Sequence, residues 1–397
     1  MCTAKLAWRI SYWCSANGTV NMNVRYTVYK SDISYFSGKL EAYLRYKEIP
    51  HKLIEVDQTA MRRIGAKTGV LKIPAIEMDT GQWLFDTTPM MRWLEIQHPD
   101  APVLPEDPAL AFIALLLEDY GDEWLWRPAM WWRWVPKVSR VALGRRIAAQ
   151  NISRALAIPC GYYFGRRQLN EWLWNDGVDK RNSFAVRDML YRELETLEAV
   201  FATQPFMLGS LPSAADFGYF ASMYRHFGND PISGEVLRRE APNTSEWLAR
   251  LWNTKHSKLA DQIAAPQWIW PHADYWSTLL DRLANDYLPY LHQNAVAFSQ
   301  RQTRYNYQGK SLSFVNTVTT HYRVWCRQEL QREFNLLSGA NQQRVRCLFA
   351  GVGGIESLHR DGVIESGLCG QFNLPVNGVS QPNQLSLRKK IFGQPRN

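Results

Sequence analysis

Residues 70–94, VLKIPAIEMDTGQWLFDTTPMMRWL, decide the fold of this chain. Two short apolar runs flank the turn sequence DTG at 79–81, and glycine is favoured where a tight turn needs a positive φ. The pattern predicts a β-hairpin followed by a helix, because Asp86 or Thr87 can accept the free amides of a helix start and apolar residues then recur at helical spacing. Pro74 stands at the entrance of the first strand, where a proline is tolerated and a cis peptide would have a purpose.

The segment before the hairpin completes a specific order of elements. Residues 26–29 predict a first strand, 34–46 a helix and 51–56 a second strand. With the hairpin, this order resembles the thioredoxin-like N-terminal domain of the glutathione transferases over residues 24–104, and SYFSGKL at 34–40 is similar to the family's strand-to-helix segment. The resemblance implies an α/β domain that binds glutathione.

The resemblance also implies roles for single residues of this domain. Pro74 would be the family's cis-proline, which turns the backbone amide and carbonyl beside it, at Ile73, toward the cysteinyl part of glutathione. Asp86 and Thr87 replace the family's Glu-Ser pair, which holds the γ-glutamyl carboxylate at a helix N-terminus. Two lysines are candidates for the glycyl carboxylate and can equally be solvated surface charges: Lys39 and Lys72.

Catalysis in this family needs a hydrogen-bond donor that stabilises the thiolate of bound glutathione. A free thiol has a pKa of about 8.5, and a donor together with a helix N-terminus brings it into the neutral range. Ser34 occupies the matching place at the start of the first helix, and its hydroxyl would donate to the sulfur without a His or Asp partner. Ser34 can also be only a helix cap, and a shift of alignment would give the donor role to one of three neighbours: Ser31, Tyr35 or Ser37.

A second match with the same family lies about 120 residues further along the chain. FMLGSLPSAADF at 206–217 is similar to the stretch that starts a buried helix of the family's all-helical second domain, and 242–248 resembles a later helix of it. Ser213 and Asp216 have the spacing of a capping box, which is a structural feature. The expected fold is therefore an α/β thioredoxin-like domain followed by an all-α glutathione transferase C-terminal-like domain.

Tryptophan is concentrated between these two matches, in EDYGDEWLWRPAMWWRW at 118–134. On helical spacing, Trp124, Trp131 and Trp134 can share one face with Tyr120, and the candidate substrate contacts among them are Tyr120, Trp124 and Trp131. In the family this region lines the pocket for an apolar electrophile, so the resemblance implies that these three side chains contact a hydrophobic substrate. Packing in the core or at the domain junction is the alternative, because aromatic residues carry large buried areas wherever they lie.

The chain of 397 residues is longer than the resemblance requires, and its last part is expected to add helices. Apolar spacing predicts further helices at 275–298 and 317–337, and the Gly-, Pro-, Asn- and Gln-rich end predicts a tail without a packed core. The expected organisation is an extension that is disordered or an unused upstream start at 1–23, the glutathione-binding domain at 24–104, the helical domain at 105–265, additional helices at 266–360 and a flexible tail at 361–397.

Composition limits the other classes of protein. The net charge is +9, but Lys and Arg accompany no zinc-finger, RNA-recognition or helix-turn-helix pattern, so no nucleic-acid partner is expected. The longest apolar runs fall short of the roughly 20 residues that span a bilayer. Six scattered cysteines without CxxC or zinc-ligand spacing indicate a reducing cytoplasm and no metal site.

These observations predict a glutathione transferase-like enzyme that adds the thiolate of its co-substrate glutathione to a small hydrophobic electrophile, as in detoxification. A homodimer is expected from the resemblance alone. The alternative is a non-catalytic binding or assembly module, because one fold supports many functions. The position of Ser34 and the place of the C-terminal helices distinguish the two.

Overall fold

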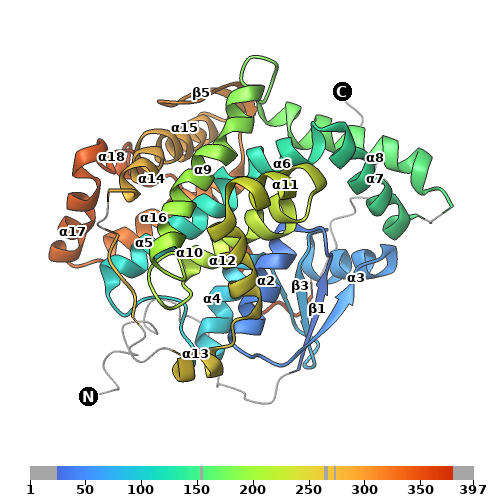
Figure 1. Ribbon diagram of the computed structural model, residues 1–397, viewed down its shortest axis with the longest axis horizontal. Helices are drawn as coiled ribbons and strands as arrows, with labels where there is room; N and C mark the ends of the chain where they lie inside the picture. Colours follow the sequence, from blue (N-terminus) through green and yellow to red (C-terminus); the bar gives the residue numbers. More distant parts are fainter. Residues whose placement is uncertain (1–24, 153–154, 263–266, 272–273, 379–397) are drawn as a thin grey trace.

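The computed structural model describes residues 25–152, 155–262, 267–271 and 274–378. The extension expected at 1–23 lies outside the described residues, as do residues 379–397. A small α/β domain forms one side of the molecule, and the helices from the rest of the chain pack against it and extend away from it (Figure 1). No helix in the described ranges has the length and the apolar character needed to cross a membrane.

The N-terminal domain is thioredoxin-like, as predicted. Its sheet has the order β2-β1-β3-β4, in which β2 is parallel to β1 while the β1–β3 and β3–β4 pairs are antiparallel. The hairpin predicted at 75–85 is β3 and β4, and Gly81 of its turn has the expected positive φ of 83°. The elements are β1 Tyr26–Lys30, α2 Tyr35–Tyr46, β2 His51–Glu55, α3 Gln58–Thr68, β3 Ala75–Met78, β4 Trp83–Phe85 and α4 Thr87–Gln97.

Alternation along the strands gives this sheet two buried faces. Val28, Ile76 and Leu84 are paired across three strands and belong to the large core that includes residues of α2 and α4. Tyr29 and Trp83 face the opposite side and pack in a smaller cluster with residues of α3. Because the side-chain period of a strand is two, both faces can be covered by helices, which is the layered arrangement of an α/β domain.

The middle of the chain forms a large helical domain. Its elements are α5 Pro108–Asp119, the π-helical turn η1 Tyr120–Trp124, α6 Trp126–Trp134, α7 Lys137–Asn151, α8 Ala157–Trp172, η2 Trp174–Asp176, α9 Ser183–Thr203, α10 Ala214–Ser222, the π-helical turn η3 Met223–Gly228, α11 Pro231–Glu240, α12 Pro242–Asn253 and α13 His256–Gln262. The predicted capping box of Ser213 and Asp216 begins α10. Helix α10 lies so close to α5 that a Cβ at Gly218 would come within 2.5 Å of the Glu118 Cα, so glycine is required there.

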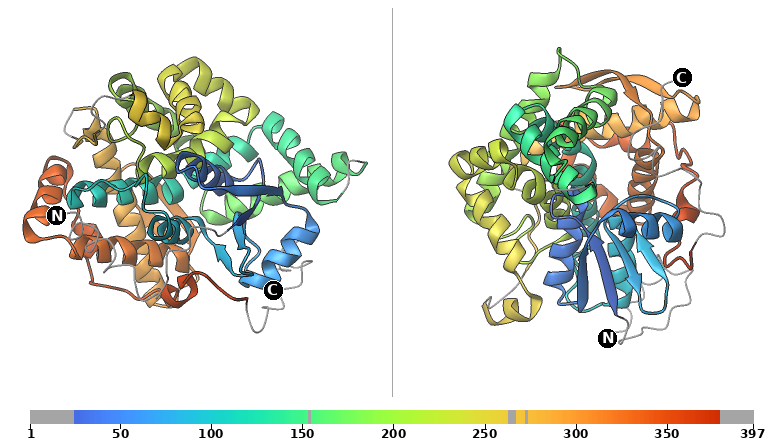
Figure 2. Two further views of the ribbon diagram at one scale, coloured as in Figure 1. Left: turned by 90° about the horizontal axis from the view of Figure 1, so that it is seen from below. Right: turned by 90° about the vertical axis from the view of Figure 1, so that its right-hand side faces the viewer.

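The additional residues fold against this helical domain at the end of the molecule opposite α7 and α8 (Figures 1 and 2). They form α14 Trp276–Arg282, the π-helical turn η4 Leu283–Tyr287, α15 Leu288–Ser299, β5 Arg304–Gln308, β6 Ser313–Val318, α16 His321–Asn335, α17 Gly339–Phe349, η5 Ala350–Val352, α18 Glu356–His359 and η6 Cys369–Phe372. The helix predicted at 275–298 is confirmed as the run α14-η4-α15.

The helix predicted at 317–337 is confirmed as α16 with a later start, whereas the prediction of a flexible tail from residue 361 was wrong as far as residue 378. The helix expected at 317–337 begins only at His321, because 304–318 alternates buried and exposed side chains and pairs as the β5–β6 hairpin. The tail expected to be flexible is packed up to residue 378. Val376 exchanges two backbone hydrogen bonds with Trp83, N–O 2.8 and 2.9 Å, and so continues the sheet at the free edge of β4. Unpaired strand edges favour such additions.

Candidate functional site

The register of the sheet brings three separate segments to one edge of the N-terminal domain. Tyr29, near the end of β1, is paired with Ala75 at the start of β3, and Ala75 is paired with Phe85 at the end of β4. The loop to α2, Pro74 and Asp86 therefore lie next to one another although they are far apart in the sequence. The Ile73-Pro74 peptide is cis, as the resemblance implied.

Ser34 is the N-cap of α2 and is half-buried. Its Oγ accepts a hydrogen bond from the Ser37 amide at 3.4 Å, which leaves the hydroxyl proton free for another acceptor. The three neighbours that the sequence left open are buried: Ser31, Ser37 and Tyr35, whose hydroxyl donates to the Gly121 carbonyl at 2.5 Å. Of the four hydroxyls, that of Ser34 is thus the one near solvent, at a helix N-terminus that favours negative charge.

Asp86 and Thr87 lie where α4 begins. Asp86 has a φ of 65° and makes no side-chain capping bond, so its carboxylate is turned away from the amides of its own helix. The Asp86 Oδ1 accepts a hydrogen bond from the Tyr322 hydroxyl at 2.9 Å, and its Oδ2 lies 4.0 Å from the Lys72 ammonium. Burial raises the pKa of the Asp86 carboxyl above its usual range. Thr87 is buried at the first position of the helix.

The prediction that Lys39 binds the glycyl carboxylate was wrong. Its side chain is fully buried, and its ammonium lies 2.6 Å from a Glu118 oxygen and 2.5 Å from an Asp122 oxygen. It also donates to the Thr88 hydroxyl at 3.3 Å, so it connects α2 and α5 to the start of α4. Lys72 remains exposed beside Asp86 and is the lysine that a ligand at this edge can reach.

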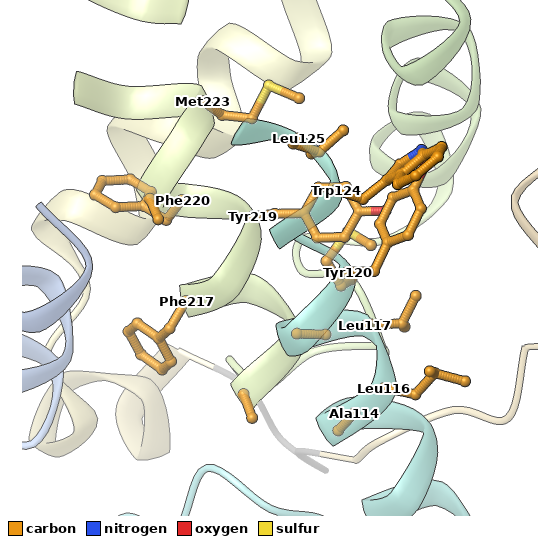
Figure 3. Packing of buried hydrophobic residues seen from close by; sticks show 14 of the residues in the cluster. Ala114, Leu116, Leu117, Tyr120, Trp124, Leu125, Phe217, Tyr219, Phe220 and Met223 are labelled. Atoms are coloured by element: carbon orange, nitrogen blue, oxygen red, sulfur yellow. The ribbon is translucent and has the colours of Figure 1, made fainter. Parts of the chain in front are cut away.

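The predicted aromatic wall is a core feature, which was the alternative interpretation. Tyr120 and Trp124 of η1 are buried among apolar side chains (Figure 3). Tyr120 packs against Tyr219 of α10, whereas Trp124 packs against Tyr287 and Tyr290 of the C-terminal residues. The Tyr120 hydroxyl donates to Glu193 at 2.9 Å, and the buried Trp131 donates its Nε1–H to Ser183 at 2.7 Å. The substrate role of these residues was implied by the resemblance, and their burial contradicts it. The turn η1 that contains Tyr120 and Trp124 is π-helical, so regular helical spacing does not hold there.

A different aromatic cluster lies near Ser34. Phe36 and Trp126 are half-buried and stacked, with ring centroids 6.4 Å apart and planes at 12°. Trp172, at the end of α8, packs edge-on against Trp126 at 5.6 Å and is 45% exposed. Sequence spacing could not find this cluster because its members come from α2, α6 and α8. The one signal for this cluster in the sequence was that Phe36 follows Ser34 by two residues.

The C-terminal residues also reach this edge of the sheet, which the sequence did not predict in detail. Tyr322 of α16 contacts Asp86 through its hydroxyl, and its ring packs edge-on against Phe372 at 6.2 Å. Phe372 in turn packs against Trp325 and Phe85. Among the described residues no group of three or more His, Cys, Asp or Glu side chains is placed to hold a metal ion.

Comparison with known proteins agrees with the topology of this domain. Residues 28–102 match the family model of the glutathione S-transferase N-terminal domain. No curated protein matches the chain. Among solved structures, a glutathione S-transferase from Pseudomonas fluorescens is 19% identical, with 57% of this chain and 93% of that chain covered and a TM-score of 0.36.

Two further solved structures contain glutathione derivatives. A glutathione S-transferase from Methylobacterium radiotolerans, in complex with glutathione sulfonate, is 19% identical, with 63% of this chain and 99% of that chain covered and a TM-score of 0.36. A maleylacetoacetate isomerase from Anaeromyxobacter dehalogenans, with bound dicarboxyethyl glutathione, is 14% identical, with 58% of this chain and 88% of that chain covered and a TM-score of 0.34.

Proposed function

Because the chain is glutathione S-transferase-like through its N-terminal domain, we propose that it binds glutathione at the sheet edge of Ser34, Pro74 and Asp86 and adds the thiolate to a hydrophobic electrophile. One observation carries the proposal. The strand register brings these three residues together, and Ser34 is the partly exposed hydroxyl among the four candidates.

Each part of glutathione meets a complementary group in this proposal. The γ-glutamyl end carries a carboxylate and an ammonium group. The carboxylate lies at the N-terminus of α4 beside Thr87, where helix amides favour an anion, and the ammonium pairs with Asp86. The cysteinyl backbone pairs with the chain beside Pro74. The exposed Lys72 is the cation for the glycyl carboxylate.

The thiol then lies at the N-terminus of α2. The Ser34 hydroxyl donates to the sulfur and the helix dipole favours the anion, so both lower the pKa of the bound thiol. The thiolate adds to the electrophilic carbon: a C–S bond forms, the multiple bond of the electrophile opens, and its electron pair takes up a proton from water. The apolar part of the electrophile packs against Phe36, Trp126 and Trp172. This cluster replaces Tyr120, Trp124 and Trp131, which are buried, as the substrate surface.

Ser34→Ala is expected to leave glutathione binding within about twofold and to lower the rate of conjugation by about 10- to 100-fold, because one charge-assisted hydrogen bond is worth about 1.5–3 kcal/mol. The pKa of the bound thiol should rise, which ultraviolet absorbance of the thiolate measures. Ser338→Ala is a matched control, since Ser338 caps α17 in the same way by accepting from the Asn341 amide. Equal rates in the two variants would remove Ser34 from the chemistry.

Asp86→Asn tests the binding step by itself. Calorimetry should show glutathione binding weakened about tenfold or more, because the neutral amide no longer pairs with the ammonium group. Thr80→Ala, in the exposed turn of the β3–β4 hairpin, should bind as the unmodified protein does. Unchanged affinity of Asp86→Asn would place any glutathione site elsewhere.

A non-catalytic module is the second candidate, and the hydrogen bond from Tyr322 to Asp86 favours it. In the proposed enzyme this bond competes with the ammonium group of glutathione. Tyr322→Phe should therefore tighten glutathione binding about fivefold, the effect of a hydrogen bond worth about 1 kcal/mol. No binding by either protein at millimolar glutathione would favour the module, in which α16 fixes Asp86 for a structural purpose.

A further inference from the structure

The loop that precedes Ser34 is held by two arginines of the helical domain. The Asp32 carbonyl accepts a hydrogen bond from the Arg225 guanidinium at 3.1 Å. The next carbonyl, that of Ile33, accepts one from the Arg133 guanidinium at 2.6 Å. Both arginines are buried, so water competes little for the two carbonyls. Two consecutive peptide groups between β1 and α2 are therefore fixed from η3 and α6.

Arg133 is itself oriented by a second set of contacts. Its guanidinium forms two hydrogen bonds with the Asp230 carboxylate, Nε–Oδ2 2.6 Å and Nη2–Oδ1 2.9 Å, and Nη2 also donates to the Arg225 carbonyl at 2.7 Å. Its Nη1 lies 2.6 Å from the Nε2 of His226. Burial and the neighbouring guanidinium lower the pKa of His226 well below its usual range, so the imidazole is neutral. The bidentate pair fixes the plane of the guanidinium and aims Nη1 at Ile33.

Arg225 is placed by partners on α2 and in the loop. Its Nη2 donates to Glu41 Oε2 at 3.1 Å, and its Nη1 lies 3.6 Å from Asp32 Oδ1. The side chain passes over α2 at Gly38, where a Cβ would lie 2.5 Å from the Arg225 Cγ. Glycine lowers helix propensity, so its presence inside α2 has a packing reason. A larger residue at this position would displace the guanidinium from the loop.

We propose that Arg133 and Arg225 are positioning residues, which fix the loop so that the Ser34 hydroxyl and the N-terminus of α2 face the sulfur of bound glutathione. This inference rests on the proposed function. Ser34 directly follows the two held peptide groups, and its own amide donates to the Ser31 carbonyl at 3.0 Å. Because a peptide group is planar, fixing its carbonyl also fixes its plane. Rotation of either group would move the Ser34 backbone and, with it, the hydroxyl.

The two contacts also act on the electrostatics of the thiolate site. A carbonyl oxygen carries partial negative charge, so unpaired carbonyls beside a thiolate would raise the pKa of the thiol. Each guanidinium binds one of these oxygens, which leaves the positive end of the α2 dipole as the field that the sulfur meets. Both cations are paired with carboxylates, those of Asp230 and Glu41, and the two pairs add no net charge. The effect therefore depends on the position of the donors.

Arg225→Lys tests the position of the loop while keeping the positive charge. A lysine ammonium can pair with Glu41, but it lacks the planar fork that reaches Glu41 and the Asp32 carbonyl together. With benzylideneacetone, an apolar enone, as the electrophile, we expect kcat to fall about 10-fold while KM for glutathione stays within about twofold. The pKa of the bound thiol, measured by ultraviolet absorbance, should rise by about one unit. Arg133→Lys should change both quantities in the same direction.

Gly38→Ala is a second variant, which keeps every charge and displaces the Arg225 side chain through the added Cβ. It should raise the thiol pKa in the same way although alanine favours the helix. Arg45→Lys is the control. Arg45 also pairs with Glu41, at 3.7 Å, and donates to the Trp252 carbonyl at 3.2 Å, but it lies in the last turn of α2, away from the loop. This variant should keep the kcat and the thiol pKa of the unmodified protein.

Hydrogen exchange of amides in residues 31–37, followed by mass spectrometry, examines the loop without glutathione. Exchange should be about 10-fold faster in Arg225→Lys and Gly38→Ala than in Arg45→Lys. Unchanged exchange in the first two variants would overturn the proposal, as would a lower stability with unchanged kcat and thiol pKa. Absence of glutathione binding by the unmodified protein would contradict the proposed function, and the exchange rates would still decide whether the arginines hold the loop.

Discussion

Replacing Lys39 with methionine is expected to reduce the free energy of unfolding by about 3–5 kcal/mol. The Lys39 ammonium is fully buried between Glu118 and Asp122, at 2.6 and 2.5 Å, and both carboxylates are nearly buried themselves. Methionine fills most of the volume but leaves two like charges without a cation in a region from which water is excluded. Removing one partner of a buried ion pair lowers the free energy of unfolding by more than the intact pair contributes to it.

The pH dependence of this variant has a definite sign. Burial already raises the pKa of Asp122, and loss of the ammonium raises it further. A carboxyl whose folded-state pKa lies above its unfolded value binds more protons when folded, so stability falls as the pH rises through that interval. Lys39→Met should therefore be closest to the unmodified protein at acidic pH and lose stability toward neutral pH, as measured by urea unfolding at several pH values.

Two controls separate a buried charge from a ligand site. Lys52→Met removes an exposed lysine from β2 and should change stability by less than about 0.5 kcal/mol. Lys39→Met/Glu118→Gln/Asp122→Asn removes all three charges and should recover much of the loss. If Lys39 were instead a ligand for the glycyl carboxylate, Lys39→Met would weaken glutathione binding while the unfolding free energy stayed unchanged.

Lys39 also shows where prediction from the sequence ends. Its place on a helix could be predicted, but its partners are 79 and 83 residues away, and local spacing carries no information on such contacts. In contrast, the β3–β4 hairpin and the position at which α4 begins were predicted correctly, because turn chemistry and alternation act within a few residues. The cis peptide before Pro74 was implied by the family resemblance. The π-helical turn after Asp119 lies between these two cases. The helix there could be predicted, but an extra residue in one turn rotates every later side chain about the helix axis.

The prediction of a flexible tail from residue 361 failed for the same physical reason, which is contact with residues far away in the sequence. Residues 361–378 are rich in residues typical of loops, and their order comes from the free edge of β4 and from aromatic partners on α16. Composition describes the segment alone and not the surface that receives it. The candidate site is affected directly, because Tyr322 and Phe372 come from this part of the chain and reach Asp86 and Phe85.

Asp216→Ala is expected to cost about 4 kcal/mol or more of unfolding free energy. The carboxylate of this fully buried residue accepts hydrogen bonds from the Met207 amide at 2.8 Å, the Ser213 amide at 2.9 Å, the Ser213 hydroxyl at 2.9 Å and the Trp247 Nε1–H at 3.1 Å. Alanine leaves these donors without an acceptor, and each unsatisfied buried group costs about 1–3 kcal/mol. The loop before α10 and the helix α12 both lose their connection to α10.

Asp57→Ala is the matched control, because Asp57 also caps a helix, accepting from the Ala60 amide at 2.8 Å, but it is exposed. Loss of an exposed cap costs about 1 kcal/mol. Urea unfolding of the two variants should therefore differ by about 3 kcal/mol. Equal losses would show that the buried donors of the Asp216 site find other acceptors when the carboxylate is removed.

A double-mutant cycle identifies the source of the cost. Ser213→Ala removes the one hydroxyl donor of the set, so in the Asp216→Ala background it eliminates a group that is already unsatisfied. The second replacement should then cost less than it does in the unmodified protein, by about 1 kcal/mol. Additive losses would mean that the Ser213 hydroxyl does not depend on Asp216. If the second replacement instead costs less, the stability of the contact between α10, the loop before it and α12 comes from satisfied hydrogen bonds. The volume of the Asp216 side chain is then not its source.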